Sequence, residues 1–326
     1  MTEPRTDARD DAQNRTEDEH HESFSDRVDD RADGIASAAA AGDIEQAGLW
    51  RDAWRQLRRN PFFIVGALLF VVFAVMALAP QLFTSVDPRA CDLARSGDGP
   101  QQGAPFGYDV QGCDYYANVV HGARVSLSIG FLAVLGTLAV GLVVGALAGY
   151  YGGWIDSLLA RVTDIFYGLP LILGAIILLS VLPERGVPEV SLALIAFGWM
   201  TAMRLVRSNV IGVKQSDYVQ AARALGARTG RIIVRHIMPN AVAPVLVYST
   251  IAVGTIIASE ATLTFLGVGL QLPEISWGLQ INAAQNRLRD APHLILFPSL
   301  FLSLTVLAFI LMGDALRDAL DPKLRR

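Results

Sequence analysis

Six stretches of this 326-residue chain are apolar enough and long enough to cross a lipid bilayer. A helix needs about 20 residues, at about 1.5 Å of rise each, to span a hydrocarbon core about 30 Å thick. The sequence therefore predicts an all-α membrane protein with six transmembrane helices. The predicted spans are residues 62–83, 123–149, 162–182, 190–210, 241–266 and 293–313.

The distribution of arginine and lysine predicts the orientation of these spans. Segments that face the cytoplasm carry an excess of both residues, and with a cytoplasmic N-terminus the count is about sixteen inside against six outside. An even number of spans places both ends of the chain on one side. We therefore expect both termini to be cytoplasmic.

The N-terminal segment, residues 1–48, differs from the rest of the chain. Acidic residues strongly outnumber basic ones there, and no periodic apolar face is present. Such a segment cannot bury enough apolar surface to offset the entropy of ordering. We predict a disordered acidic cytoplasmic tail, in which His20 and His21 are a solvated pair rather than a metal site.

Residues 49–61 connect this tail to the first span. Trp50, Ala53, Trp54 and Leu57 have helical spacing, and arginines occupy the opposite face. This pattern predicts a short amphipathic helix in the membrane interface, with an ordinary cytoplasmic helix as the alternative. The six-helix transmembrane domain then occupies residues 62–326.

The two cysteines, Cys91 and Cys113, both lie in the segment 84–121 between the first two spans. The predicted orientation places this segment outside the cell, where disulfides persist. A bridge would close a loop of about 23 residues, worth roughly 3 kcal/mol in the chain-entropy model. A metal site, with the adjacent Asp92 and Asp114, is the alternative but has too few ligands. We predict a disulfide and no metal site.

The longest predicted cytoplasmic loop, residues 211–240, has the composition of two short helices. Asp217 and Gln220 have the spacing of a capping box, and the alanines that follow favour a helix. Gly226 suits the left-handed position just past a helix end. We expect a second helix to end before Pro239. From composition alone, this loop is equally well described as an ordinary connector.

The same loop resembles a motif of the membrane subunits of ABC importers, in which Glu-Ala-Ala is followed by Gly and a hydrophobic-Pro ending. Gln220 stands at the usual Glu position and Met238 at the usual Leu position. In that family the loop inserts into a cleft of the ATPase subunit and transmits its closure. The residues that the resemblance assigns to coupling are Gln220, Ala221, Ala222, Ala224, Leu225, Gly226, His236, Pro239 and Asn240.

The resemblance extends over nearly all of residues 48–326 and is to the C-type permease of dipeptide, oligopeptide and nickel importers. It rests on residues 149–156, Phe265–Gly269 with Ser276–Gly278, and Gly313–Asp318. The chain departs from the family pattern at Phe106–Asp114, where Cys113 replaces an Arg.

This resemblance implies a type I ABC importer permease-like bundle in a bacterial cytoplasmic membrane. The implied partners are a second related permease, two ATP-binding subunits and an external solute-binding protein. ATP and Mg would be bound by the ATP-binding subunits, and this chain would hold no cofactor.

Sequence motifs of catalysis are absent from the chain. It has no Gly-x-x-x-x-Gly-Lys-Ser/Thr loop, no His-Glu-x-x-His and no Gly-x-Ser-x-Gly. We therefore expect a non-catalytic transport subunit, and nothing indicates nucleic-acid binding. Two alternatives are an ion-coupled secondary transporter or channel, for which internal repeats are missing, and a membrane scaffold whose acidic tail recruits partners.

Among the charged residues in or directly beside the predicted spans, Arg161, Asp164 and Glu260 are candidates for a functional or structural role. A charge at mid-depth costs about 2.5–3.5 kcal/mol on insertion scales, so each should face protein or water. Arg161 and Asp164 are three residues apart on one helix face and could pair. Glu260 either lines the translocation path or bonds to neighbouring backbone, and we favour a structural role for all three. Di- or oligopeptides are the leading solutes, followed by nickel complexes or glutathione-like molecules.

Overall fold

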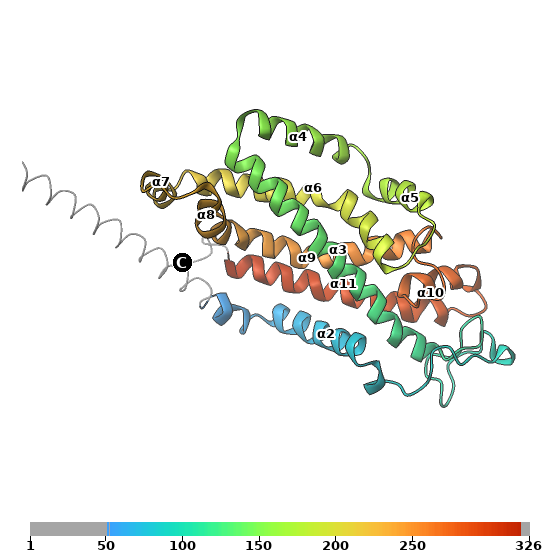
Figure 1. Cartoon of the computed structure of the whole chain (residues 1–326). Coiled ribbons are helices and arrows are strands. Elements are labelled where there is room, and N and C mark those ends of the chain that lie inside the picture. Colours follow the sequence, from blue (N-terminus) through green and yellow to red (C-terminus); the bar gives the residue numbers. More distant parts are fainter. Residues whose placement is uncertain (1–50, 52, 321–326) are drawn as a thin grey trace, which may run out of the picture.

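A computed structural model describes residue 51 and residues 53–320, and in this part of the chain the regular elements are helices (Figure 1). The tail predicted at residues 1–48 lies outside the described residues. Five helical runs are long and apolar enough to cross a membrane, and a bent pair of helices makes a sixth crossing if counted as one span. The prediction of an all-α bundle with six spans is confirmed in this form. The five runs are Pro61–Leu78, Tyr115–Tyr151, Val187–Lys214, Thr229–Phe265 and His293–Leu320.

The first span, α2 (Pro61–Leu78), begins at a side-chain cap. Asn60 Oδ1 accepts the backbone N–H groups of Phe62 and Phe63, at 2.9 and 3.4 Å. The helix ends five residues before the predicted residue 83. The physical reason is Pro80, since the residue preceding a proline is disfavoured in helical conformation. A short 3₁₀ turn, η1 (Pro80–Leu82), follows.

Helix α3 (Tyr115–Tyr151) is longer than the predicted 123–149. Asp114 Oδ1 accepts the N–H of Ala117 at 2.8 Å and fixes its start. Its end is set by Gly152, which has a φ of +67°. With 37 residues the helix is about 55 Å long and extends beyond the hydrocarbon core of a bilayer.

The prediction of one continuous third span at 162–182 is wrong. The chain forms α4 (Gly153–Tyr167) and α5 (Leu171–Val181), which meet at an angle of 82°. The break falls at Gly168 and Pro170, because proline lacks the N–H that would continue the helix and restricts the residue before it.

Helices α3 and α6 (Val187–Lys214) pack closely through glycines spaced four residues apart. A Cβ on Gly141 would lie 2.6 Å from Ala202 Cβ, and one on Gly145 would lie 2.6 Å from the Met203 carbonyl oxygen. A Cβ on Gly149 would likewise lie 2.9 Å from the Arg207 carbonyl oxygen. Small residues at this spacing let two membrane helices approach backbone to backbone. The distance between the two helix axes is therefore set by the backbone rather than by large side chains.

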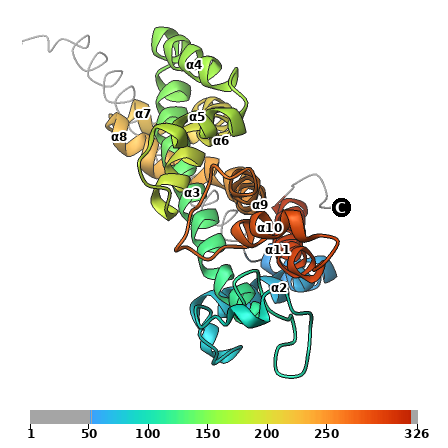
Figure 2. The ribbon, with the colours of Figure 1, turned by 90° about the vertical axis from the view of Figure 1, so that its right-hand side faces the viewer.

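Helix α11 (His293–Leu320) packs between α2 and α9 (Met238–Phe265). Glycines again lie at the contacts. A Cβ on Gly66 of α2 would lie 2.8 Å from the Ala308 carbonyl oxygen. A Cβ on Gly254 of α9 would lie 3.2 Å from the Val306 carbonyl oxygen. Figures 1 and 2 show α4 and α2 on opposite sides of the bundle, with α3 and α9 between them.

The short elements lie at the two ends of the bundle (Figure 1). One end, which we call the α7 end, holds α7 (Asp217–Ala224), α8 (Thr229–Arg231), the start of α2 and the end of α11. The opposite end, which we call the disulfide end, holds the cysteine-containing segment and α10 (Trp277–Ala284). Its other short elements are η2 (Leu93–Arg95) and η4 (Gln285–Arg287).

The described part of the segment predicted as an interfacial helix packs on the protein. Ala53 and Leu57 are buried against Ala315 and Ala319 near the end of α11, while Trp54 is 56% exposed. One face of the predicted helix therefore contacts α11, and Trp54 points away from it.

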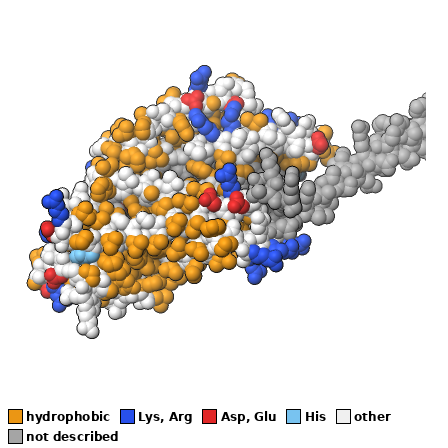
Figure 3. Space-filling view, turned by 180° about the vertical axis from the view of Figure 1, so that it is seen from behind, with side chains coloured by type: hydrophobic (Ala, Val, Ile, Leu, Met, Phe, Trp, Pro, Cys, Tyr) orange, Lys and Arg blue, Asp and Glu red, His pale blue; other side chains and the backbone are white. Residues whose placement is uncertain are grey.

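A broad hydrophobic face lies between the two ends of the molecule (Figure 3). Exposed apolar side chains on the outer helices include Phe62 and Leu68 of α2 and Leu296 and Leu300 of α11. An apolar surface of this extent on the outside of a helical bundle is typical of contact with lipid or with another membrane subunit.

The glycine contact between α3 and α6 gives a testable prediction about stability. Gly145→Ala places a methyl group 2.6 Å from the Met203 carbonyl oxygen, so the helices must separate at a cost of about 1–3 kcal/mol. Gly212→Ala is the matched control, since Gly212 lies in α6 and a Cβ added there would meet nothing within 4 Å. Thermal unfolding in detergent, followed by size-exclusion chromatography, should show a lower Tm for Gly145→Ala alone. Equal Tm values for both variants would contradict the close contact.

Candidate functional site

Helix α7 lies at one end of the bundle and terminates in a turn at Gly226. Gly226 has a φ of +79°, the left-handed position expected from the sequence. The N–H of Ala227 donates to the Ala222 carbonyl oxygen at 3.1 Å, and the N–H of Gly226 donates to that of Arg223 at 3.0 Å. This pair of bonds is the Schellman motif, which satisfies the last carbonyl groups of a helix and turns the chain sharply.

The capping box expected from Asp217 and Gln220 does not form. Ser216 occupies the N-cap position, and its side chain makes no cap bond because the hydroxyl donates back to the Val213 carbonyl oxygen in the last turn of α6. Gln220 Nε2 instead donates to the Gln215 carbonyl oxygen at 3.4 Å. The helix begins one residue earlier than the box requires.

Helix α7 is anchored on the ends of α3 and α6. Val219 is fully buried in a cluster that includes Val206 and Val210 of α6. Tyr150, at the end of α3, lies under two cations: Lys214 Nζ is 5.4 Å from the centre of its ring and the Arg223 guanidinium is 5.8 Å from it. The face of α7 that carries Val219 is therefore fixed to the transmembrane helices.

The other face of α7 is open. Leu225 is 75% exposed, and Gln220, Ala224 and Gly226 are also exposed. A small, partly apolar and rigidly held surface of this kind suits the close approach of another protein.

The second helix of the loop does not end before Pro239, contrary to expectation. Thr229–Phe265 is one helical run, in which α8 passes through the π-helix η3 (Ile232–Ile237) into α9. A π-turn shifts the backbone hydrogen bonds locally, and Pro239 then occupies the first turn of α9, where its missing N–H is tolerated. Asn240 Nδ2 donates to the His236 carbonyl oxygen at 2.8 Å across this junction.

The predicted coupling residues therefore form two groups. Gln220 to Gly226 lie on α7 and in the turn that ends it, whereas His236, Pro239 and Asn240 lie where η3 joins α9. The two groups are connected through one buried hydrophobic cluster, since Val219 of α7 packs with Ile232 and Ile237 of η3.

Asp164 pairs with Arg204 of α6 rather than with Arg161, so the predicted pair within one helix is wrong. The Arg204 Nη2 to Asp164 Oδ1 distance is 2.7 Å, and the Arg204 guanidinium lies 4.2 Å from the centre of the Tyr167 ring. A second pair joins the same helices, because Arg207 Nε and Nη2 donate to the two oxygens of Asp156 at 2.5 and 2.7 Å. These bonds tie α4 to α6, and Arg161 is exposed.

Glu260 is fully buried near the disulfide end of α9. Its Oε1 accepts the Thr264 hydroxyl at 2.8 Å, and Ser276 lies close to its carboxyl group. The Thr264 hydroxyl oxygen accepts the N–H of Leu270 at 3.1 Å. Glu260 thus holds the loop between α9 and α10 against the end of α9.

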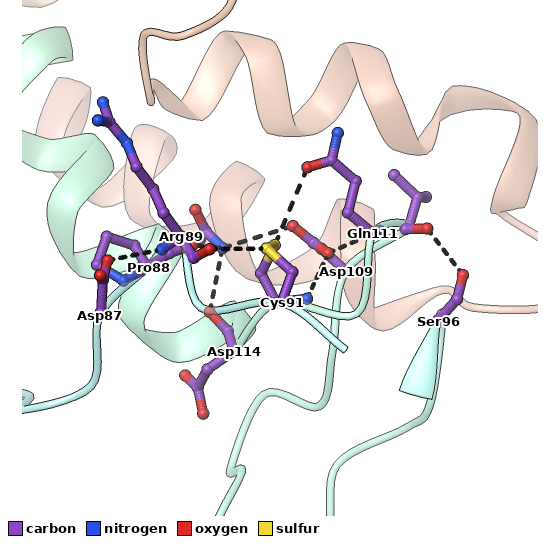
Figure 4. Close-up of a disulfide and its surroundings, with 11 residues drawn as sticks. Asp87, Pro88, Arg89, Cys91, Ser96, Asp109, Gln111 and Asp114 are labelled. Carbon is purple, nitrogen blue, oxygen red and sulfur yellow. Dashed lines mark hydrogen bonds between the residues drawn. A yellow bond between two sulfur atoms is a disulfide. The ribbon is translucent and has the colours of Figure 1, made fainter. Parts of the chain in front are cut away.

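Cys91 and Cys113 are joined by a disulfide in the structure. Asp109 organises the loop that it closes, as Figure 4 shows: its Oδ1 accepts the N–H groups of Gln111 and Cys113, both at 2.8 Å. Gly112 lies so close to the Asp92 carbonyl oxygen that no side chain would fit. Covalent and backbone contacts together fix the shape of this segment.

A cavity of about 420 Å³ lies between α5, α6 and α9, at the break that follows α4. Its lining combines apolar side chains with the hydroxyl groups of Tyr167, Thr201, Tyr248, Thr255 and Ser259, and carries no charged side chain. This site was not among the predictions from sequence. The available signal was the spacing of Tyr248, Thr255 and Ser259, which lie seven and four residues apart and therefore share one face of the helix.

Comparison with known proteins identifies the class of this bundle. Residues 141–326 match the family described as binding-protein-dependent transport system inner membrane component, and residues 48–100 match the N-terminal TM domain of oligopeptide transport permease C. These matches define a multi-pass transport permease, a non-catalytic transmembrane component. The chain belongs to the C-type permease subunits of ABC importers.

Several individual relatives are similar over most of their length. The dipeptide transport system permease protein of Alkalihalophilus pseudofirmus is 40% identical over 85% of this chain and 90% of its own length. The oligopeptide transport system permease protein of Bacillus subtilis is 36% identical over 89% and 96%, respectively. A glutathione transport system permease protein of Pectobacterium atrosepticum is 37% identical over 85% and 92%.

A solved structure shares the fold. The MetNI methionine ABC transporter, in inward-facing conformations, has a TM-score of 0.53 at 19% sequence identity. The likeness covers 62% of this chain and 96% of that chain.

The disulfide gives a prediction that a gel can check. The non-reduced protein should migrate differently from the reduced protein, and Cys91→Ser should abolish this difference. Loss of the bridge should also lower the free energy of unfolding by roughly 3 kcal/mol for a loop of this length. Identical mobility of the reduced and non-reduced parent protein, isolated with free thiols blocked, would show that the bridge is not formed in the cell.

Proposed function

We propose that this chain is a permease subunit that carries short peptides, or similar small solutes, through the cytoplasmic membrane on energy from ATP hydrolysed by partner subunits. The observation that carries the proposal is α7: it is anchored on α3 and α6 by one face, and its exposed face ends in Gly226 and Leu225. The dipeptide, oligopeptide and glutathione systems named among its relatives support the solute class.

The partners follow from this proposal. A second related permease would complete the membrane unit, two ATP-binding subunits would hold ATP and Mg, and an external solute-binding protein would deliver the solute. The α7 end, with both ends of the chain, would face the cytoplasm, and the disulfide end would face outward. This orientation is supported by the excess of arginine and lysine near the α7 end.

Coupling would then be mechanical. A partner that pulls on the exposed face of α7 moves Val219, which packs with Ile232 and Ile237 of η3. Because η3 continues directly into α9, a displacement of α7 is transmitted to the helix that lines the hydroxyl-bearing cavity. The buried contact of Val219 with Val210 passes the same displacement to α6.

The hydroxyl-bearing cavity is our proposed part of the translocation path. Uncharged hydroxyl groups bind a solute weakly and without preference for one side chain, which suits passage rather than retention. Thr255 and Ser259 bond to backbone carbonyl oxygens of their own helix, at 3.3 and 2.9 Å, so the surface is stable both with and without solute.

The proposal is tested by reconstituting the complex in liposomes and measuring uptake of a labelled dipeptide. Uptake should require ATP and should survive an uncoupler of ion gradients. Uptake that persists without ATP but collapses with the uncoupler would instead support an ion-coupled secondary transporter.

Gly226 and Gly230 form a matched pair for the coupling role. Gly226→Val forces a β-branched residue into a φ of +79°, whereas Gly230 lies in a helix with open space around it. We expect Gly226→Val to reduce copurification of the ATP-binding subunits and to lower ATP-driven uptake about tenfold or more, equivalent to about 1.4 kcal/mol of lost coupling. Gly230→Val should change neither. Full uptake by Gly226→Val would argue against coupling through α7.

Thr255 and Thr250 form a matched pair for the path. Both hydroxyl groups donate to a carbonyl oxygen of α9, four residues back, but Thr255 alone of the two lines the cavity. Thr255→Leu should lower the maximal rate of uptake while leaving the thermal stability of the complex unchanged. Thr250→Leu should transport like the parent, and an equal loss in both variants would contradict the proposed path.

A further inference from the structure

A half-open cavity of about 700 Å³ lies at the disulfide end, between the disulfide-closed segment and the loop that connects α9 to α10. Residues from 88–91 and 109–113 form one wall, and residues from 267–276 form the other. Gln280 of α10 lines the cavity together with the start of α3. A volume of this size is within the range of small-ligand sites, about 300–1,000 Å³.

Arg89 provides a cation in this cavity. Its Nη2 donates to the Pro273 carbonyl oxygen at 3.2 Å, which bridges the two walls and orients the guanidinium. A guanidinium has five N–H donors and matches the geometry of a carboxylate. The remaining donors are suited to a ligand carboxylate.

Asp109 provides an anion on the same wall. Its Oδ1 accepts two backbone N–H groups of the loop, and its Oδ2 is 3.5 Å from Asn118 Nδ2, at the limit of a hydrogen bond. Burial raises the pKa of the Asp109 carboxyl above its usual range, although backbone N–H groups of Cys113, Gln111 and Gly112 lower it. A nearby ammonium group would stabilise the charged form.

Gln280 provides a buried acceptor. It is 8% exposed, and its Nε2 donates to the Asn118 carbonyl oxygen at 2.8 Å, which fixes the orientation of the amide. Within the part of the chain that the structure describes, its Oε1 has no hydrogen-bond partner. An unpaired buried acceptor costs about 1–3 kcal/mol, which a ligand N–H would recover.

We propose that this cavity is a reception site for a short peptide with free amino and carboxyl ends. Arg89 binds the carboxylate, Asp109 binds the ammonium group, and Gln280 Oε1 accepts a peptide N–H. Apolar side chains of the lining, Leu270 and Leu279 among them, contact the side chains of the peptide. The inference rests on the proposed function and adds the place where the solute first contacts this subunit.

A solute fits these groups better than a loop of the solute-binding protein does. Gln280 is a buried residue of the cavity lining, and the same lining carries charged groups of both signs. A protein loop would present internal amide groups, whereas a cation, Arg89, and the carboxylates of Asp109 and Glu274 in one small site match the two ends of a zwitterion.

The test is direct binding to the purified complex of membrane and ATP-binding subunits, without the solute-binding protein. The probes are labelled alanyl-leucine, its N-acetyl form and its C-terminal amide. The parent complex should bind the free dipeptide about tenfold more tightly than either blocked form, because each block removes one ionic contact worth roughly 1.4 kcal/mol.

Substitutions of Asp109 and Arg89 test separately which residue binds the amino end of the peptide and which binds the carboxyl end. In Asp109→Asn the N-acetyl and free dipeptides should bind equally, while the preference for a free carboxylate is retained. In Arg89→Gln the C-terminal amide and the free dipeptide should bind equally, while the preference for a free amino group is retained. The matched controls, Asp98→Asn and Arg95→Gln, change the same residue types in the same segment outside the cavity lining and should behave like the parent.

Misfolding of the loop would weaken the binding of all three probes together and would also alter the disulfide-dependent gel mobility. These two effects distinguish misfolding from the loss of a single contact. Two outcomes would overturn the inference: parent complex that binds no dipeptide, or variants that keep both preferences. Cross-linking of the solute-binding protein through Gln111, with no dipeptide binding, would likewise overturn it. ATP-driven uptake by the parent is measured separately, and its absence would overturn the proposed function instead.

Discussion

The backbone contact between α3 and α6 determines where the functional elements of this protein lie. Gly141, Gly145 and Gly149 leave no room for a side chain, so the two helices are held at a fixed distance along this stretch. Their ends at the α7 end then form the platform for α7, through Tyr150 of α3 and Lys214 of α6. Helix α4, which follows α3 directly, is tied back to α6 by two ion pairs. A change in this contact would move α4 and α7 together.

The two ends of the bundle are stabilised by different means. At the α7 end, packing and a glycine turn hold α7 in place, and Leu225 stays exposed. At the disulfide end, a covalent bridge, a buried carboxyl group and a buried tryptophan fix the loops. Trp277 Nε1 donates to the Val119 carbonyl oxygen at 2.9 Å, and Glu260 lies close to Ser276 in the loop beside it. The loop between α9 and α10 is thereby held against α3 and the end of α9, and the outer cavity lies between this loop and the disulfide-closed segment.

This arrangement connects the two proposed sites through α9. The helical run that carries α8, η3 and α9 begins at the α7 end and finishes at Glu260 and Phe265, beside the outer loop. The hydroxyl-bearing cavity lies along its length. A displacement that starts at α7 therefore acts on one continuous element that contacts both the proposed path and the support of the outer cavity.

Hydrophobic length by itself determined the fold class and located five of the six predicted spans, because a stretch of about 20 apolar residues has few alternatives to a membrane helix. Local chemistry also determined the glycine that ends α7, since that position requires a positive φ. The tertiary structure alone decided the partners of charged and polar groups. Asp164 pairs with Arg204 on another helix, Ser216 turns its hydroxyl away from α7, and Glu260 is buried by a loop distant in sequence. The chain breaks at Pro170 but stays helical through Pro239, where a π-helix precedes the proline, and the presence of a proline by itself does not distinguish these two outcomes.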